Sequence, residues 1–214
     1  MEEDCEYNLL FEHPARFLIF GPSCSGKTTF VQNYLNKLSD FYDFEFDRIV
    51  YCSESGSSIK TNINDKIIFK SELNEDLINT FQPSKNNLLI IDDMMQNVIN
   101  NQISTDLFTK RSHHSNITIL FLTQNLYPKS KYMRDVSINS NYIVLMKNPI
   151  ERLQINILSN RIEGKTKDNR LLLAYKEATE KPYSYLLIDL CQKTPNILKY
   201  RSNIFDENFQ TVYI

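Results

Sequence analysis

The sequence has little glycine, no tryptophan and no long apolar run. Only four of its 214 residues are glycine, which excludes collagen-like and low-complexity chains. No apolar stretch approaches the roughly 18 residues that a membrane-spanning helix needs. The four cysteines form no CxxC pair and are spread from Cys5 to Cys191. A disulfide scaffold is therefore not expected, and a reducing compartment is favoured.

The chain also lacks an excess of either charge. Lys and Arg number 24 against 26 Asp and Glu, which gives a formal net charge of −2 at pH 7. This balance excludes a protein that coats nucleic acid by bulk electrostatics, although a local basic loop can still contact a phosphate backbone. The first residues are acidic, whereas signal and transit peptides begin with basic ones. We therefore expect a soluble intracellular protein with no membrane span.

Short apolar runs alternate with longer amphipathic stretches, which is typical of an α/β domain with a mainly parallel sheet and helices on both faces. Strands are expected at residues 16–20, 48–52, 66–69, 88–91, 117–122, 142–146 and 185–190. Helices are expected at 28–38, 94–111, 149–162 and 169–180, the last with Asp168 as its N-cap. A loop is expected over 53–64. The predicted organisation is one domain over 14–194, with extensions at 1–13 and 195–214.

The segment GPSCSGKT, from Gly21 to Thr28, matches the pattern GxxxxGK[ST] at every fixed position. Its glycines allow a tight turn in which successive N–H groups face a bound phosphate, and the following helix directs its positive dipole end at the same anion. Lys27 has the reach to bind the β- and γ-phosphates, and the Thr28 hydroxyl can bind Mg²⁺. The predicted ATP contacts are Gly21, Pro22, Ser23, Cys24, Ser25, Gly26, Lys27, Thr28 and Thr29.

Two carboxylates, Asp92 and Asp93, follow the buried strand expected at 88–91. Ligands of open α/β sheets bind outside the carboxyl ends of the strands. Asp92 therefore fits the Walker B role, in which an acid holds Mg²⁺ beside Thr28. Asp93 would then orient or deprotonate the attacking water. Capping of the next helix by the Asp pair is the structural alternative, and Asp93 can serve both purposes.

The strand expected at 117–122 ends in Thr123-Gln124-Asn125. In ATPases with an acidic residue beside the Walker B acid, the strand between the phosphate-loop strand and the Walker B strand ends in a polar sensor of the γ-phosphate. Gln124 is the first candidate for this role and Asn125 the second. The alternative is a polar turn residue that satisfies loop backbone groups.

Arg111 and Arg134 flank this strand and are candidates for an arginine finger donated to a neighbouring subunit. A solvated surface arginine is the alternative for each. The segment 125–135 also contains Lys129 and Lys131 with interleaved tyrosines, which predicts either a DNA-contacting loop or a plain solvated loop.

These segments together resemble a known group. GPSCSGKTTF, FDRIVYC, LLIIDDMM, DLFTKRSHHSNITILFLTQNLY and INSNYIVLMKNP, followed by LLLAYKEATEKPYSYLLIDL and TPNILKYRSNIF, resemble the genome-packaging ATPases of Polinton-like elements and adintoviruses. That group belongs to the FtsK–HerA superfamily and is similar to the poxvirus packaging ATPase. The resemblance covers roughly residues 14–206, and the segment 106–127 is more diagnostic than the phosphate loop.

The resemblance implies a P-loop NTPase domain of the RecA-like (ASCE) type that hydrolyses ATP with Mg²⁺. It implies a homo-oligomeric ring that moves double-stranded DNA into a viral capsid, with capsid or portal proteins as partners, in the host cytoplasm or nucleus at the site of virion assembly. It supports Lys27, Thr28, Asp92 and Gln124 in the roles given above. Two positions depart from the group: Asp93 stands where Glu is more common, and Lys110-Arg111 stands where an Arg-Gly pair is expected.

Two other functions remain open at the level of sequence. GPSxSGK also occurs in guanylate kinases, so a small-molecule nucleotide kinase is possible, but an acid pair and Gln124 fit attack by water better than transfer to a hydroxyl. The second alternative is a nucleotide-binding switch or an inactive genomic copy. All of the expected catalytic positions are intact, which argues against an inactive copy.

Overall fold

A nine-stranded mixed sheet organises the described part of the chain. The computed structural model describes residues 9–54, 56, 59–92, 94, 102–127, 136–164, 169–207 and 209–214. The strands are β1 Arg16–Phe20, β2 Arg48–Ser53, β3 Ile67–Lys70, β4 Asn87–Asp92, β5 Ile117–Thr123, β6 Tyr142–Met146, β7 Tyr185–Asp189, β8 Tyr200–Ser202 and β9 Thr211–Val212.

Their order across the sheet is β3-β2-β4-β5-β1-β6-β7-β8-β9. The six strands from β3 to β6 are parallel to their neighbours, and β7, β8 and β9 continue the sheet antiparallel beyond β6. The prediction of one α/β domain with a mainly parallel sheet is confirmed. Strand β5 lies between β1 and β4, as the sensor prediction requires.

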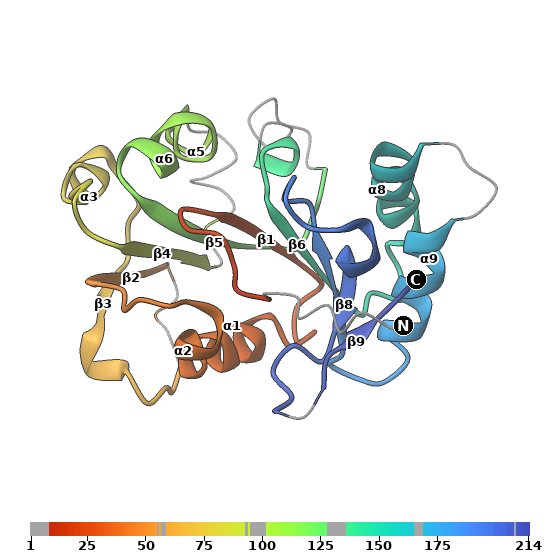
Figure 1. Ribbon diagram of the computed structural model, residues 1–214. Helices are drawn as coiled ribbons and strands as arrows, with labels where there is room; N and C mark the ends of the chain where they lie inside the picture. The colour runs from red at the N-terminus through yellow and green to blue at the C-terminus, as the bar shows by residue number, and fades with distance from the viewer. Residues whose placement is uncertain are drawn as a thin grey trace.

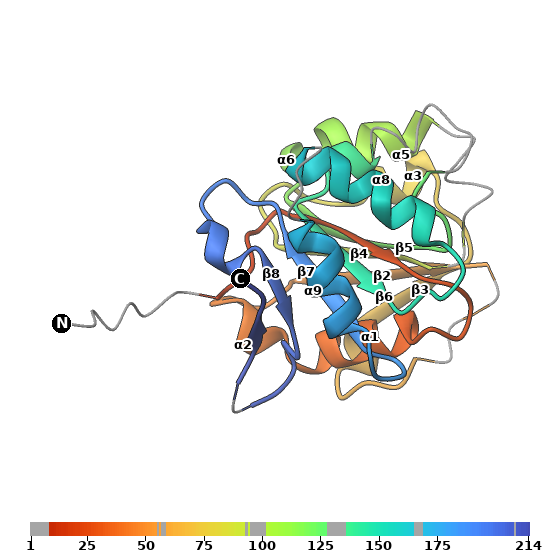
Figure 2. The same ribbon diagram turned by 90° about the vertical axis from the view of Figure 1, so that its right-hand side faces the viewer.

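Helices cover both faces of this sheet (Figure 1). They are α1 Lys27–Asn36, α2 Leu38–Phe41, α3 Glu75–Asn79, α5 Gln102–Asp106, α6 Ser112–His114, α8 Arg152–Glu163 and α9 Arg170–Ala178. A π-helical turn over Leu107–Arg111 joins α5 to α6, and 3₁₀ turns occupy Asn64–Lys66 and Asn196–Leu198. Figures 1 and 2 show α1 and α2 on one face and α3, α5, α6 and α8 on the other.

Alternation of side chains along each strand supplies a separate apolar core to each face. In β1, Phe17 and Ile19 point to the face covered by α1, whereas Leu18 and Phe20 point to the face covered by α8 and α9. All four side chains are fully buried. Because both faces are covered, β1 is apolar at every interior position, and its end is held firmly where the glycine-containing loop begins.

The structure differs from the sequence expectations mainly in short elements. Helix α3 was not expected; Asn74 caps it by accepting a hydrogen bond from the Leu77 N–H at 2.9 Å. The helix expected over 94–111 is described only from residue 102, and it contains the π-helical turn. Residues 200–202 and 211–212 form strands that extend the sheet, a conformation that their sequence did not indicate. Asp168 lies outside the described residues.

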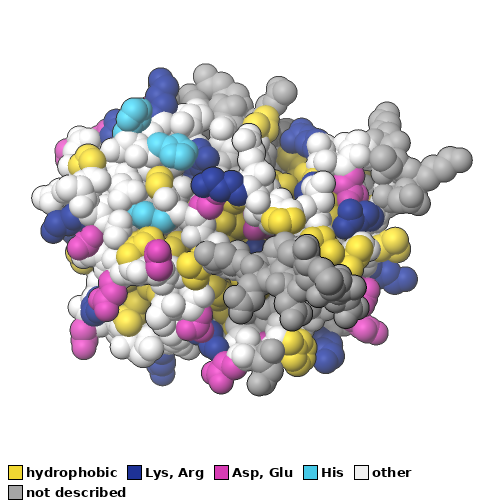
Figure 3. Space-filling view, viewed as in Figure 1, with side chains coloured by type: hydrophobic (Ala, Val, Ile, Leu, Met, Phe, Trp, Pro, Cys, Tyr) yellow, Lys and Arg dark blue, Asp and Glu magenta, His cyan; other side chains and the backbone are white. Residues whose placement is uncertain are grey.

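Charged side chains of both signs are mixed on the surface. Figure 3 shows Lys and Arg interspersed with Asp and Glu over the described residues of this face, in keeping with the net charge of −2. No helix within the described ranges has both the length and the apolar character needed to cross a bilayer.

His13, just before β1, is held in its neutral form. Its Nδ1 lies 2.7 Å from Thr118 Oγ1 on β5, and that oxygen already accepts the Ala15 N–H at 3.2 Å. The other ring nitrogen, Nε2, is buried and has no hydrogen-bond partner among the described residues, which disfavours the protonated imidazole, because both of its N–H groups would need acceptors. Burial lowers the pKa of His13 from 6.5 to about 4.

We expect this histidine to make the protein less stable in acid. An unfolded chain binds the proton near pH 6.5 and the folded chain only near pH 4, so stability is lost as the pH falls through that interval. Allowing for the partial exposure of the ring, the loss should be about 1 kcal/mol. Urea unfolding near neutral pH and near ~4.5 should show a smaller acid loss for His13→Gln than for the parent. The exposed His114 provides the control, and equal acid losses in the parent, His13→Gln and His114→Gln would contradict the assignment.

Candidate nucleotide-binding site

The loop after β1 carries the backbone geometry expected of a phosphate cradle. Cys24 and Gly26 have left-handed φ values of 59° and 102°, which turn the chain sharply before α1 begins at Lys27. The Gly21 N–H donates to the Thr123 carbonyl at 3.1 Å, so the loop starts hydrogen-bonded to the end of β5. The first N–H groups of α1 have no intrahelical acceptor and are directed at this turn, which is the arrangement that binds anions.

Close packing requires glycine at position 21, and the backbone conformation favours it at position 26. A Cβ on Gly21 would lie 2.6 Å from Met146 Cβ, well inside the closest approach of two carbon atoms. A Cβ on Gly26 would lie 3.2 Å from Met146 Cε, and its φ is unfavourable for any other residue. Met146 is the last residue of β6. The loop is therefore clamped between β5 on one side and β6 on the other.

Two polar side chains of the loop fit a phosphate ligand. Lys27 Nζ donates to the carbonyl oxygens of Gly21 and Pro22 at 2.8 Å each, which holds the ammonium group at the mouth of the turn. The buried Ser25 hydroxyl has no hydrogen-bond partner among the described residues. A buried polar atom without a partner is costly, and phosphate oxygens are suitable acceptors for it.

Asp92, at the end of β4, is oriented by a buried tyrosine. The Tyr51 hydroxyl on β2 donates to Asp92 Oδ2 at 2.5 Å, and the Tyr51 ring is 1% exposed. Short hydrogen bonds to a carboxylate are the strong ones, and this bond fixes the rotamer of the acid. One carboxylate oxygen is thus engaged by a neutral donor while the Asp92 side chain remains partly accessible. This geometry suits an acid that binds Mg²⁺ through water or directly.

The two sensor candidates at the end of β5 differ in their hydrogen bonds. The Asn125 side-chain oxygen accepts the Tyr127 N–H at 2.9 Å, and the Asn125 backbone is bonded to the Thr123 hydroxyl, so Asn125 stabilises the turn. Gln124 is exposed, and its side chain makes no hydrogen bond within the part of the chain that is described. The geometry therefore favours Gln124 as the residue that contacts a ligand, and its sensor role stays a prediction.

The strand order brings the predicted site residues to one edge of the sheet. Gly21 and Gln124 directly follow the parallel strands β1 and β5, and Asp92 is the last residue of β4, with β5 between the other two strands. Carboxyl ends of parallel strands share an edge, so the loop, the acid and the sensor candidate face the same space. Asp93 lies outside the described residues, and its role as the base stays a prediction.

Arg111 lies at the opposite edge of the sheet from the phosphate loop. It belongs to the turn before β5, where its guanidinium binds Glu75 Oε2 at 2.7 Å and Asn79 Oδ1 at 3.2 Å on α3. It therefore does not reach the loop of its own chain, and any part in the chemistry would be on a neighbour's nucleotide. Arg134, Lys129 and Lys131 lie outside the described residues.

Sequence reasoning missed two residues that shape the site. Tyr51 lies in a buried strand whose other residues are mostly apolar. No local motif indicates that its hydroxyl binds Asp92, which is 41 residues further along the sequence. Met146 packs against both loop glycines. Only the pairing of β2 with β4 and of β1 with β6 brings these residues to the loop.

The overall fold matches that of a solved genome packaging NTPase. The genome packaging NTPase B204 from Sulfolobus turreted icosahedral virus 2, solved with ATP-γS, superposes with a TM-score of 0.57 at 14% identity, covering 94% of this chain and 96% of that one. The KaiC-like protein PH0186 from Pyrococcus horikoshii superposes with a TM-score of 0.47 at 13% identity, covering 95% and 92%. No protein-family profile matches the chain, and no curated protein matches its sequence. The chain thus has the fold of a P-loop NTPase.

Removing the Tyr51 hydroxyl should weaken the metal site without disturbing the sheet. Tyr51→Phe keeps the buried ring but frees the Asp92 carboxylate to rotate. A hydrogen bond to a charged group contributes about 1.5–3 kcal/mol, so we expect the Mg²⁺ concentration needed for half-maximal ATP binding to rise about tenfold.

The matched control is Tyr200→Phe, which removes another tyrosine–carboxylate bond, that of Tyr200 to Glu163 at 2.7 Å, away from the loop. A similar rise in both variants, measured by titrating Mg²⁺ at fixed nucleotide, would mean that Tyr51 acts only through stability.

Proposed function

We propose that this protein is an ATP-hydrolysing motor that packages double-stranded DNA into a viral capsid. One observation supports nucleotide binding and hydrolysis. Three features lie at one edge of the sheet: the glycine-clamped loop with Lys27, the oriented Asp92 and the accessible Gln124. The strand order of this sheet is that of an ASCE ATPase. A sensor strand between the loop strand and the acid strand suits hydrolysis by water, because it directs a polar group at the γ-phosphate.

The roles of the residues follow from their placement. The loop residues from Gly21 to Thr29 hold the phosphates, and Thr28 with Asp92 would hold Mg²⁺, which neutralises the phosphate charge during transfer. Gln124 positions the attacking water, and Asp93 accepts its proton. Nothing in this scheme requires a second protein domain.

The packaging role is supported by the resemblance of the segments described above and by the fold shared with B204, which is itself a genome packaging NTPase. The same role implies a ring of identical subunits that acts inside the host cell, with capsid or portal proteins as partners. Mixed surface charge and a net charge of −2 mean that DNA contact must be local, with Lys129 and Lys131 as the proposed contacts.

Lys27→Ala should abolish ATP turnover, because it removes the charge that faces the phosphates. Turnover in the parent should increase when double-stranded DNA is added, and this increase should shrink as salt rises. The measurement is phosphate release with and without DNA. Lys37→Ala, at the other end of α1, is the control and should behave like the parent. A monomeric parent with turnover indifferent to DNA would favour the nucleotide kinase instead.

The arginine finger can be located by mixing inactive subunits. Loss of a finger lowers turnover about 10³- to 10⁵-fold, so Arg134→Ala or Arg111→Ala should be nearly inactive if that residue serves a neighbour. Mixing the inactive arginine variant with Lys27→Ala should restore part of the activity, because one subunit supplies the loop and the other the arginine. Full activity of Arg134→Ala alone would exclude Arg134 as the arginine finger. Full activity of Arg111→Ala would exclude Arg111 in the same way and would mean that its role is to bind α3.

A further inference from the structure

An exposed aromatic side chain lies against the phosphate loop without belonging to its motif. Tyr183, in the turn between α9 and β7, is 70% exposed. A Cβ on Gly26 would lie 3.5 Å from Tyr183 Cβ and 3.6 Å from Tyr183 Cδ1, so the tyrosine is in van der Waals range of the loop just before α1. A large apolar ring left in solvent beside a ligand-binding loop is available to contact a ligand.

The backbone at Tyr183 is held in an unfavourable conformation. Its φ is 62°, a left-handed value at which glycine or asparagine is usual and a bulky side chain is rare. The turn is fastened on both sides: the Ser184 hydroxyl donates to the Lys181 carbonyl at 2.6 Å, and the Lys147 N–H donates to the Ser184 carbonyl at 3.3 Å. Non-glycine residues held in this region occur preferentially at ligand sites, where their direction matters.

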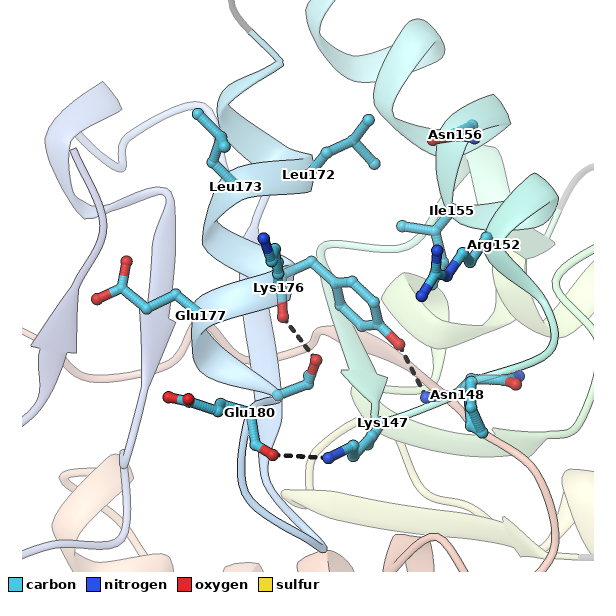
Figure 4. A pocket seen from close by; sticks show the side chains of 13 residues that line it. Lys147, Asn148, Arg152, Ile155, Asn156, Leu172, Leu173, Lys176, Glu177 and Glu180 are labelled. Carbon is cyan, nitrogen blue, oxygen red and sulfur yellow. Dashed lines mark hydrogen bonds between the residues drawn. The ribbon is translucent and has the colours of Figure 1, made fainter.

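Lys147 ties the same turn to β6. Its Nζ donates to the Glu180 carbonyl at 2.6 Å, and both residues line a groove of about 1060 Å³ between α8 and α9 (Figure 4). Lys147 directly follows Met146, which packs against Gly21 and Gly26. The turn that carries Tyr183 is thus fixed to the same strand end that clamps the phosphate loop.

The strand order determines on which side of the loop a nucleoside would lie. Asp92 and Gln124 follow β4 and β5, which lie on one side of β1, whereas the Tyr183 turn leads into β7 beyond β6, on the other side. Metal and sensor act on the γ-phosphate, so that end of the triphosphate points toward β4 and β5. The phosphates form a linear chain, and the nucleoside is therefore directed toward β6 and β7.

We propose that the purine base of the bound nucleotide stacks on the ring of Tyr183. This inference rests on the proposed nucleotide-binding function and adds a base subsite to it. Stacking on an aromatic ring contributes to the affinity for a base of any identity, because every base presents a π-face. Tyr183 would then contribute affinity for the nucleoside part of ATP and none for the phosphates.

The test separates the base from the phosphates by comparing ATP with inorganic tripolyphosphate, both with Mg²⁺, in calorimetric titrations of the full chain. Tyr183→Gly removes the ring at a φ that glycine adopts freely, and it should bind ATP about ten- to a hundredfold more weakly. Tyr183→Phe keeps the ring and should bind ATP like the parent. Binding of tripolyphosphate should be the same in all three. Phe209→Ala, which removes a different exposed ring of 62% exposure, is the control and should not change either affinity.

The other outcomes overturn the inference in distinguishable ways. If Tyr183→Gly loses ATP and tripolyphosphate affinity together, Tyr183 shapes the loop and does not contact the base. If it loses neither, no stacking occurs. If the parent binds tripolyphosphate but gains nothing from the nucleoside, the base has no subsite here, although the loop is a phosphate site. If the parent binds neither ligand, the proposed function and the base subsite fail together.

Discussion

The close packing at the end of β1 is the constraint on which the site depends. Position 21 has no space for a side chain, because a Cβ there would lie 2.6 Å from Met146 Cβ. The same residue donates its N–H to Thr123 on β5. The phosphate loop is therefore fixed to both neighbours of β1 at once. A loop held in this way presents its N–H groups in one arrangement, and an arrangement that is preorganised binds a ligand with a smaller entropic cost.

The sheet converts this local clamp into a complete site. Parallel strands with both faces buried place their carboxyl ends at one edge of the sheet. Asp92 and Gln124 therefore lie at the same edge as the loop, although they are far from it in the sequence. The two apolar cores, one on each face, hold β1, β4 and β5 in register, with five residue pairs between β1 and β5 and five between β4 and β5. The antiparallel strands β7, β8 and β9 extend the sheet on the other side and carry the turn with Tyr183 past the loop.

Two charged groups of the site are oriented by hydrogen bonds to neutral partners. The carbonyl oxygens of Gly21 and Pro22 accept from Lys27, and the Tyr51 hydroxyl donates to Asp92. These bonds fix where the ammonium group and the carboxylate point. By contrast, Arg111 is paired with Glu75, and the buried pair Arg201–Asp189, at 2.8 Å, links β8 to β7 as part of the structure.

The fold class, seven of the strands and the phosphate loop could be predicted from the sequence, because these depend on local features: buried strands are continuous apolar runs, and GxxxxGK[ST] encodes its own turn. The sequence also ranked Gln124 above Asn125 as the sensor, and that order stays a prediction, while the Asn125 side chain is engaged in the turn. Three contacts depend on the tertiary structure: Tyr51 binds Asp92, Met146 excludes a side chain at Gly21 and packs against Gly26, and Tyr183 borders the loop. Each of these contacts joins residues from different strands or turns, and their distance in space is set by strand pairing, which no local pattern specifies.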